Sequence, residues 1–341
     1  MRLSTALLAD TSVRLAELSF PHTRVLLHRT RLAFIHIDKL LHYAKADRDG
    51  RVDGFIAVSL PTEVIVFLLK TGELSSVISF TEAGRTVRAI PAALKHIKRE
   101  AERGEISYCA APMEQLVWMH SSCANPRVPL QLDLERPDRV LPGLMADGFS
   151  GVLELIVDGR VNYLLFDDGV YQCGHFYYDL AGRTVQQYMQ ELLEADADGR
   201  VPEVAASVVP AAEEYPEQAT PLLIQTYREL FWAIAKAAEA QVSGEGMKRA
   251  ERVRDLQANV HTALLAIGAK DEAAETAADD LVSTPQELMF ALSDWALQFL
   301  EEVEVIAPGI APQVLQEATR EQRFMLQKAG FYDRLPWTVT W

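Results

Sequence analysis

Two short stretches bring a histidine and a thiol close together in the sequence. His120 and Cys123 enclose the stretch HSSC, and Cys173 and His175 flank a single glycine. A thiol beside a histidine is a pairing that nucleophilic catalysis uses, but such a site also needs an orienting group and oxyanion donors. A cysteine on a strand is more often a small buried apolar side chain. We therefore predict no catalytic residues, and we keep an enzyme with a site at Cys173 and His175 as an alternative.

Two acidic stretches have part of the pattern of a calcium-binding loop. In DRDGRVDG (47–54), Lys45 and Ile56 stand at the first and twelfth places of the loop, where calcium needs a ligand and a bidentate acid. In EADADG (194–199), Ala205 stands at the twelfth place. The signatures HExxH, CxxC, GxxxxGK[ST] and GxGxxG are also missing from the sequence. The sequence therefore predicts no metal site and no cofactor.

The composition of the 341-residue chain disfavours several classes of partner. The formal net charge of -15 opposes binding to nucleic acid and to anionic lipid. The sequence contains no run of about 18 uncharged apolar residues, so we expect no membrane insertion. The three cysteines fit no disulfide framework, which favours a reducing, cytoplasmic location. We expect the partners to be other proteins, and homo-oligomerisation is left open.

The tetrapeptide GRTV occurs at 84–87 and again at 182–185, where it ends a longer repeat. The segments 54–80 and 151–177 align without a gap, and one added residue then superposes the two GRTV stretches. The alignment equates glycines at three places, and glycine is typical of turns. The glycines that the alignment equates are Gly54 with Gly151, Gly72 with Gly169, and Gly84 with Gly182.

Each copy has the pattern of three antiparallel strands followed by a helix. In the second copy, apolar runs are separated by Asp-Gly pairs at 158–159 and 168–169, which favour tight hairpin turns. After GRTV, the apolar spacing changes from that of a strand to that of a helix. A short amphipathic helix is expected before each set of strands, at 38–46 and 138–146. Each copy is thus an α+β unit in which helices cover one face of a sheet.

This order of elements resembles the PATAN module of bacterial response regulators and related signalling proteins. The likeness lies in the Leu-Leu pair at 40–41, the strand GVLEL (151–155) and the hairpin LLFDDG (164–169). It covers about 32–119 and 138–209. The first copy departs from the pattern because it lacks the aspartate of the hairpin turn, and no receiver domain is evident. The resemblance implies signal transduction through protein binding, in two-component, motility or chemotaxis-type regulation.

The C-terminal part has the pattern of a helical bundle. Thr220-Pro221 and Thr284-Pro285 each place a capping hydroxyl before a proline at the first helical position. The aromatic tail is too apolar to stay exposed, so we expect it to dock. The fold class is α+β, with two repeated antiparallel-sheet and helix units plus an all-α bundle. The expected divisions are an N-terminal extension (1–31), a first PATAN-like unit (32–124), a linker (125–137), a second PATAN-like unit (138–210) and the helical bundle with its docked tail (218–341).

The arginines of the two GRTV stretches are candidates for recognising an acidic partner, because a guanidinium binds a carboxylate with two donors. The reading that we favour is structural: threonine caps the following helix and glycine makes the turn before it. We predict a non-enzymatic cytoplasmic signalling scaffold, with a regulator of small GTPases of longin or roadblock type as a further alternative. The residues that we single out for partner binding are Arg85, Arg183, Asp168 and Trp337.

Overall fold

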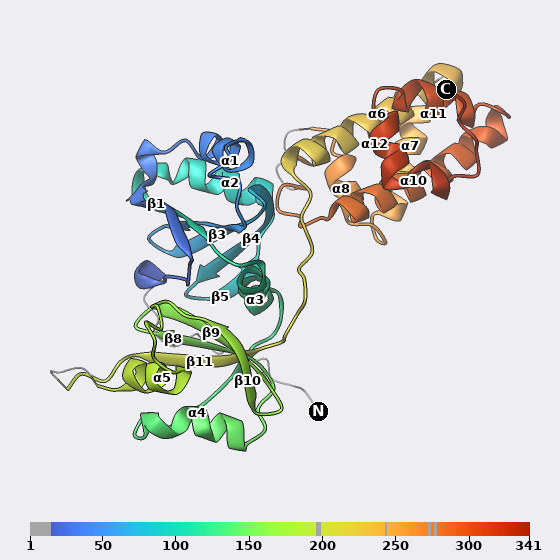
Figure 1. Ribbon diagram of the computed structural model, residues 1–341. Helices are drawn as coiled ribbons and strands as arrows, with labels where there is room; N and C mark the ends of the chain where they lie inside the picture. The colour runs from blue at the N-terminus through green and yellow to red at the C-terminus, as the bar shows by residue number, and fades with distance from the viewer. Residues whose placement is uncertain (1–14, 196–198, 243, 272–273, 276–277) are drawn as a thin grey trace. The chain divides into compact units, whose positions relative to one another are not determined.

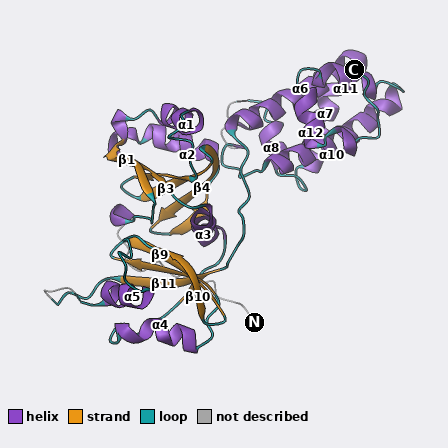
Figure 2. Cartoon of the chain, viewed as in Figure 1, coloured by secondary structure: helices purple, strands orange, loops and turns teal. Residues whose placement is uncertain are grey.

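The computed structural model describes residues 15–195, 199–242, 244–271, 274–275 and 278–341 (Figure 1). The chain divides into two compact units. The first comprises Met1–Val87 with Lys95–Tyr215, and the second comprises Arg88–Leu94 with Pro216–Trp341. Among the described residues, the strands all belong to the first unit and the second is helical (Figure 2). The predicted α+β class is confirmed.

The first sheet has the strand order β1-β6-β2-β3-β4-β5, and every neighbouring pair is antiparallel. A helix precedes β2 and another precedes β6, as the repeat predicts. The elements of this half, in chain order, are η1 (Leu15–Glu17), β1 (Arg24–Arg31), η2 (Leu32–Phe34), α1 (Ile37–Ala46), β2 (Gly54–Ser59), β3 (Glu63–Lys70), β4 (Glu73–Thr81), β5 (Gly84–Val87), α2 (Ile90–Arg99), η3 (Ala101–Arg103), β6 (Glu105–Ala110) and α3 (Met113–Ala124).

The second sheet has the order β10-β9-β8-β11-β7, again with antiparallel neighbours. Its central strands β8 and β9 are buried along most of their length. The elements of this half are β7 (Val128–Pro129), α4 (Pro137–Ala146), β8 (Gly151–Val157), β9 (Arg160–Asp167), β10 (Val170–His175), α5 (Val185–Leu193) and β11 (Val204–Val209).

The two sheets share one topology. In each, the strand after the second helix returns beside the first strand of the hairpins, as β6 lies beside β2 and β11 beside β8. The alignment of the repeats holds in detail, because β3 and β9 begin and end at residues that it equates. In each sheet a further strand, β1 or β7, pairs with the returning strand. The predicted repetition of an antiparallel-sheet and helix unit is confirmed.

The structure corrects the expected N-terminal boundary. Residues 24–31 form β1, which pairs with β6 and so belongs to the first sheet, not to a separate extension. The register between β1 and β6 shifts twice, and such bulges interrupt the alternation by which a strand is recognised in a sequence. Residues 1–14 lie outside the described part of the chain.

The two GRTV stretches adopt different structures. In the first, Thr86 pairs with Ser79 inside β5, so the expected helix cap is wrong there. In the second, Thr184 caps α5, as predicted, and the structure adds a capping box with Gln187. The difference follows from the residue three positions after the threonine, because Ala89 in the first copy has no side chain that could complete the box.

The sheets of the first unit pack face to face, with helices on their outer faces (Figure 1). Between the sheets lie apolar side chains of both, such as Val66 of β3 and Ile156 of β8, together with Trp118 of α3. On the outer face of the second sheet, Leu155 packs in one cluster with Leu141 of α4. The α3 helix therefore forms part of the core between the sheets.

The second unit is a helical bundle around one apolar core. Its two long helices begin at Pro221 and Pro285, as predicted, and Thr284 caps the second in a capping box with Glu287. The aromatic tail docks on this core, since Phe331 is fully buried. None of the described helices is long and apolar enough to cross a membrane. The helices are α6 (Pro221–Val242), α7 (Gly246–Gln257), α8 (Ala263–Ile267), α10 (Pro285–Ile306), α11 (Ala311–Thr319), α12 (Arg323–Ala329) and η4 (Tyr332–Arg334).

One turn is built identically in both copies. Gly72 and Gly169 have φ values of +78° and +75°, and the residue before each also has a positive φ, as in the tight turns of hairpins. A Cβ atom on Gly72 would lie 1.9 Å from the carbonyl oxygen of Ala44, and one on Gly169 would lie 2.3 Å from that of Met145. Each glycine thus lets a hairpin pack directly against the end of the preceding helix.

Replacing Gly72 by alanine should destabilise the first unit by about 3 kcal/mol or more, because strain from the positive φ adds to a clash with backbone that cannot move alone. The matched control is Gly182→Ala. Gly182 has a φ of +84° but open space where Cβ would lie, so the loss should be about 1 kcal/mol. Urea unfolding read by hydrogen exchange of peptides from β3 and β9 reports the first unit alone. Equal losses in the two variants would contradict the close packing of the turn.

Candidate functional site

A buried ion pair joins the two sheets of the first unit. Nη1 of Arg85, on β5, lies 2.7 Å and 2.8 Å from the two carboxylate oxygens of Glu154, on β8. The side chains of Arg85 and Glu154 are 5% and 2% exposed. The guanidinium also lies over the ring of Phe80, 5.0 Å from its centre. The arginine of the first GRTV stretch therefore binds a carboxylate of the second copy, inside the protein.

The groups around Glu154 complete a small polar network between the sheets. Ser207 of β11 donates to its carboxylate at 3.5 Å, and Arg127 lies 3.9 Å from it. Burial, and then the charge of Glu154, hold the pKa of Tyr163 well above its usual value. Burial likewise raises the pKa of Cys123 to about 12, so this thiol stays neutral. The network neutralises one buried carboxylate and exposes no reactive group.

The other residues singled out from the sequence lie in separate places. Arg183 is half-exposed and pairs with Glu191, and its Nε donates to the carbonyl of Leu180, so it holds the turn before α5. Asp168 lies exposed in the turn between β9 and β10. Trp337 packs half-buried on the core of the second unit. Arg85 is the correction: its guanidinium is not available at the surface for a partner.

The pair Cys173 and His175 lies on β10, beside Glu114 of α3. The Cys173 thiol donates to the Glu114 carboxylate, with Sγ 3.6 Å and 3.7 Å from its two oxygens, and Nε2 of His175 lies 3.3 Å from Oε2. Burial, and then the Glu114 charge, raise the pKa of the thiol to about 11. Burial also lowers the pKa of His175. A nucleophilic cysteine needs the opposite shift, because the thiolate is the reactive form.

The stretch HSSC lies at the buried end of α3. The ring of His120 stacks on that of Tyr215, with centres 4.9 Å apart and an angle of 18° between the planes. Burial lowers the pKa of His120 to about 4, so the imidazole is neutral at pH 7. The Tyr215 hydroxyl is in turn hydrogen-bonded to Ser75 of β4 at 2.7 Å. His120 thus has a structural role: its buried ring packs on Tyr215, the last residue of the first unit, which is itself hydrogen-bonded to the first sheet.

The stretch that resembles a calcium loop forms a turn after α1 at 47–53 and enters β2 at Gly54. In the turn, the backbone N–H of Asp49 donates to Oδ1 of Asp47 at 2.9 Å. The described residues contain no group of three or more His, Cys, Asp or Glu that could hold a metal ion. Part of the second stretch, 196–198, lies outside the described residues.

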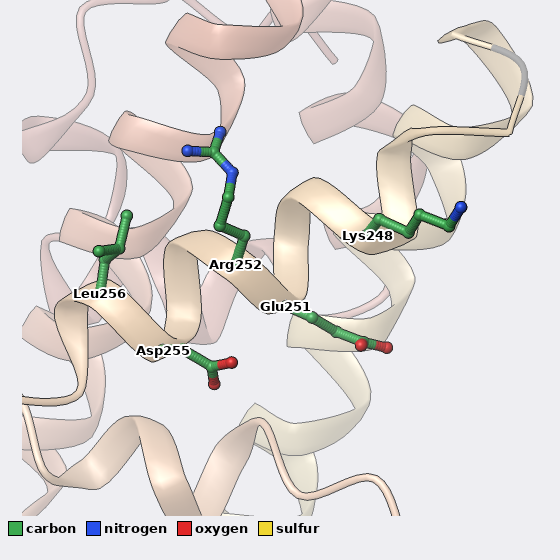
Figure 3. Close-up of a pocket in the computed structure, with 5 residues that line it drawn as sticks. All are labelled: Lys248, Glu251, Arg252, Asp255 and Leu256. Atoms are coloured by element: carbon green, nitrogen blue, oxygen red, sulfur yellow. The ribbon is translucent and has the colours of Figure 1, made fainter.

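A hollow on α7 is open to solvent and is lined by that helix alone. Figure 3 shows its five lining residues along one helix, and its volume is about 420 Å³. Three of its four charged side chains are paired with neighbours: Glu251 with Lys270, Arg252 with Glu302, and Asp255 with Arg254. A ligand site normally collects groups from several elements, and this surface does not. The five residues are Lys248, Glu251, Arg252, Asp255 and Leu256.

A second hollow, of about 260 Å³, lies in the first unit between β1, β2, β6 and the segment before β1. Its charged side chains Arg29 and Glu105 form an ion pair with each other. Nδ1 of His22 lies 3.2 Å from the carbonyl oxygen of Phe20. These groups are engaged with the protein itself, so the hollow has no charged group set aside for a ligand.

The two copies differ at the outer edge of their third strand, which is β4 in the first sheet and β10 in the second. In the first sheet, β5 pairs with residues 78–81 of β4. In the second sheet, no described strand pairs with the outer edge of β10. The other sheet edges are β1, which is bulged and rich in arginine, β5, which is four residues long, and β7, which is two residues long and contains Pro129. The pairing of β10 with β9 is also irregular, between Tyr171 and Cys173. The β10 edge carries Val170, which is 57% exposed.

Two glutamates that the sequence analysis passed over are central to this geometry. Glu154 interrupts the apolar strand GVLELIV, and its alternation with Val152 and Ile156 places it on the inner face, which is a signal of an inward-facing charge. Glu114 gives no such signal, because its role depends on β10 lying beside α3. We compared the chain with protein-family models, curated proteins and solved structures, and none of them matches it.

Replacing Arg85 by methionine should cost about 3–5 kcal/mol, because it leaves the buried Glu154 carboxylate without its main partner. The matched control is Arg183→Met, which removes the arginine of the other GRTV stretch from an exposed pair and should cost less than about 1 kcal/mol. Adding Glu154→Met to Arg85→Met should restore most of the loss. Urea unfolding monitored by hydrogen exchange of β8 measures the stability of all three variants. A double variant less stable than Arg85→Met would contradict the stabilising role of the pair.

Iodoacetamide should alkylate Cys173 at pH 7.5 about a hundredfold more slowly than an unperturbed thiol, since its pKa is raised to about 11 and the thiolate is the reactive form. A cysteine placed at the exposed Val201 supplies the reference rate. The Glu114→Gln variant should react faster, because the nearby negative charge is removed. Mass spectrometry of the modified peptide gives both rates. Alkylation of Cys173 as fast as the reference would contradict the raised pKa and would support the alternative of an enzyme with a site at Cys173 and His175.

Proposed function

We propose that this chain is a non-enzymatic cytoplasmic adaptor that works by binding other proteins, in signalling of the two-component, motility or chemotaxis type. The sequence resemblance to the PATAN module supplies the pathway class in this proposal. The docking surface in this proposal is the outer edge of β10. A strand edge binds an extended segment through main-chain hydrogen bonds, which is a common mode of peptide recognition.

The observation that carries the proposal is the contrast between the two copies after their third strand. The chain that follows β4 folds back as β5 and covers part of that strand's edge. The chain that follows β10 instead enters a turn at Gly182 and begins α5 at a capped Thr184. The outer edge of the third strand is thus partly covered in the first copy and is not paired with any described strand in the second. An unpaired strand edge can accept an extended segment, and the edge of β10, six residues long, is longer than those of β5 and β7.

The chemistry of the polar groups supports binding over catalysis. Arg85, one of the two GRTV arginines considered for binding an acidic partner, is bound to a carboxylate of the protein itself. The half-buried thiol of Cys173 has a raised pKa, and it lies against a carboxylate that disfavours its ionised form. A site for nucleophilic catalysis would need a lowered thiol pKa and donors for an oxyanion. For this reason the enzyme alternative is not our proposal.

A pull-down from native lysate tests the adaptor function. Wild type and a control with Gln186→Lys and Val201→Lys should capture the same signalling proteins, as quantified by mass spectrometry. An edge variant with Val170→Lys and Gln172→Lys should lose them at least about tenfold, because lysine on an edge strand opposes strand addition. Both variants change exposed residues and add the same charge.

Three results would count against the proposal. Equal capture by the edge variant and the control would remove β10 as the docking surface. Recovery of metabolites without proteins would argue against an adaptor. Recovery of a nucleotide-loaded GTPase would instead support the alternative of a small-GTPase regulator.

A further inference from the structure

We infer that the outer edge of β10 binds a basic extended segment of a partner protein, which adds to the second sheet as an antiparallel strand and directs an arginine or lysine to Glu114. This inference rests on the proposed adaptor function and names the chemistry of its partner. Three observations support it. The strand β5 occupies the corresponding place in the first sheet, carboxylates lie at the β10 edge, and the apolar side chain of Val170 is exposed there.

The first sheet contains a strand in the corresponding place. There β5 runs antiparallel to β4, with Arg85 opposite Phe80 and Val87 opposite Ile78. Its arginine crosses the space between the sheets to a carboxylate, Glu154. The protein therefore already contains one edge strand of the kind that we infer: short, β-branched in part, and carrying a guanidinium on the face between the sheets.

The second sheet has the carboxylate without the arginine. Glu114 lies beside Cys173 and His175, which alternate on β10 and so share one face of the sheet. The Glu114 side chain is 48% exposed, and no lysine or arginine of the described residues pairs with it. A strand added beside β10 would place alternate side chains on that same face. A basic side chain there could bond to Glu114 as Arg85 does to Glu154.

The residues at the start of β10 also favour a basic segment, which we call the guest strand. Asp167 and Asp168 lie exposed at the turn where β10 begins, which adds negative charge at one end of the docking surface. Val170 is exposed beside them and offers an apolar contact to a β-branched guest residue. A guest of the opposite charge would meet repulsion from three carboxylates, so the edge discriminates by charge as well as by shape.

The experiment uses a fluorescein-labelled peptide with the sequence of residues 81–90, TEAGRTVRAI, and its charge-reversed form TEAGETVEAI. Fluorescence anisotropy with the full-length chain should show binding of the first peptide and at least about tenfold weaker binding of the second. Glu114→Gln should weaken binding of the first peptide by about tenfold and leave the second unaffected. The edge variant V170K/Q172K should bind neither, while the control Q186K/V201K should match wild type.

The outcomes separate this inference from the adaptor function. If both peptides bind equally, or if Glu114→Gln has no effect, the basic guest is wrong. Should the lysate partners nevertheless stay sensitive to V170K/Q172K, the adaptor function stands with a guest of other chemistry. If analytical ultracentrifugation shows a dimer of the chain that V170K/Q172K dissociates, the edge binds a second copy, and this also overturns the inference. Circular dichroism confirms that each variant is folded.

Discussion

The bond between Arg85 and Glu154 is the constraint on which the first unit depends. Each half contributes one buried charge, and the loss of either would leave the other without its nearest charged partner. The pair forms with β5 in place beside β4, since β5 carries the arginine. The surrounding apolar side chains supply most of the burial, but an ion pair in such a core fixes which strand lies opposite which. We regard this specificity as its contribution to the fold.

The sequence predicted the parts of the fold that depend on local patterns. The hairpins of both copies follow from alternating apolar residues and from the glycines at 72, 159 and 169, where a positive φ is required. The capped helix at Thr184 and the two long helices of the bundle follow from hydroxyl, glutamine or glutamate, and proline at fixed offsets. In these elements the residues that determine the structure lie within a few positions of each other.

The parts that were missed depend on distant partners. The β1 strand is stabilised by β6 and carries charges and bulges that hide its alternation. The strand structure of the first GRTV stretch depends on β4, and the burial of Arg85 depends on a carboxylate in the other copy. Four identical residues thus form a strand in one copy and a turn with a helix cap in the other. Glu114 came to notice only when the structure placed it beside β10.

The short β7 strand has a consequence for how many guests one chain can hold. Because β7 ends in Pro129 and spans two residues, it cannot template a further strand on its far side. Strand addition to the second sheet is therefore favoured at β10, the longer of its two edges. Through this sheet, a chain would therefore offer a partner one long docking edge and not two.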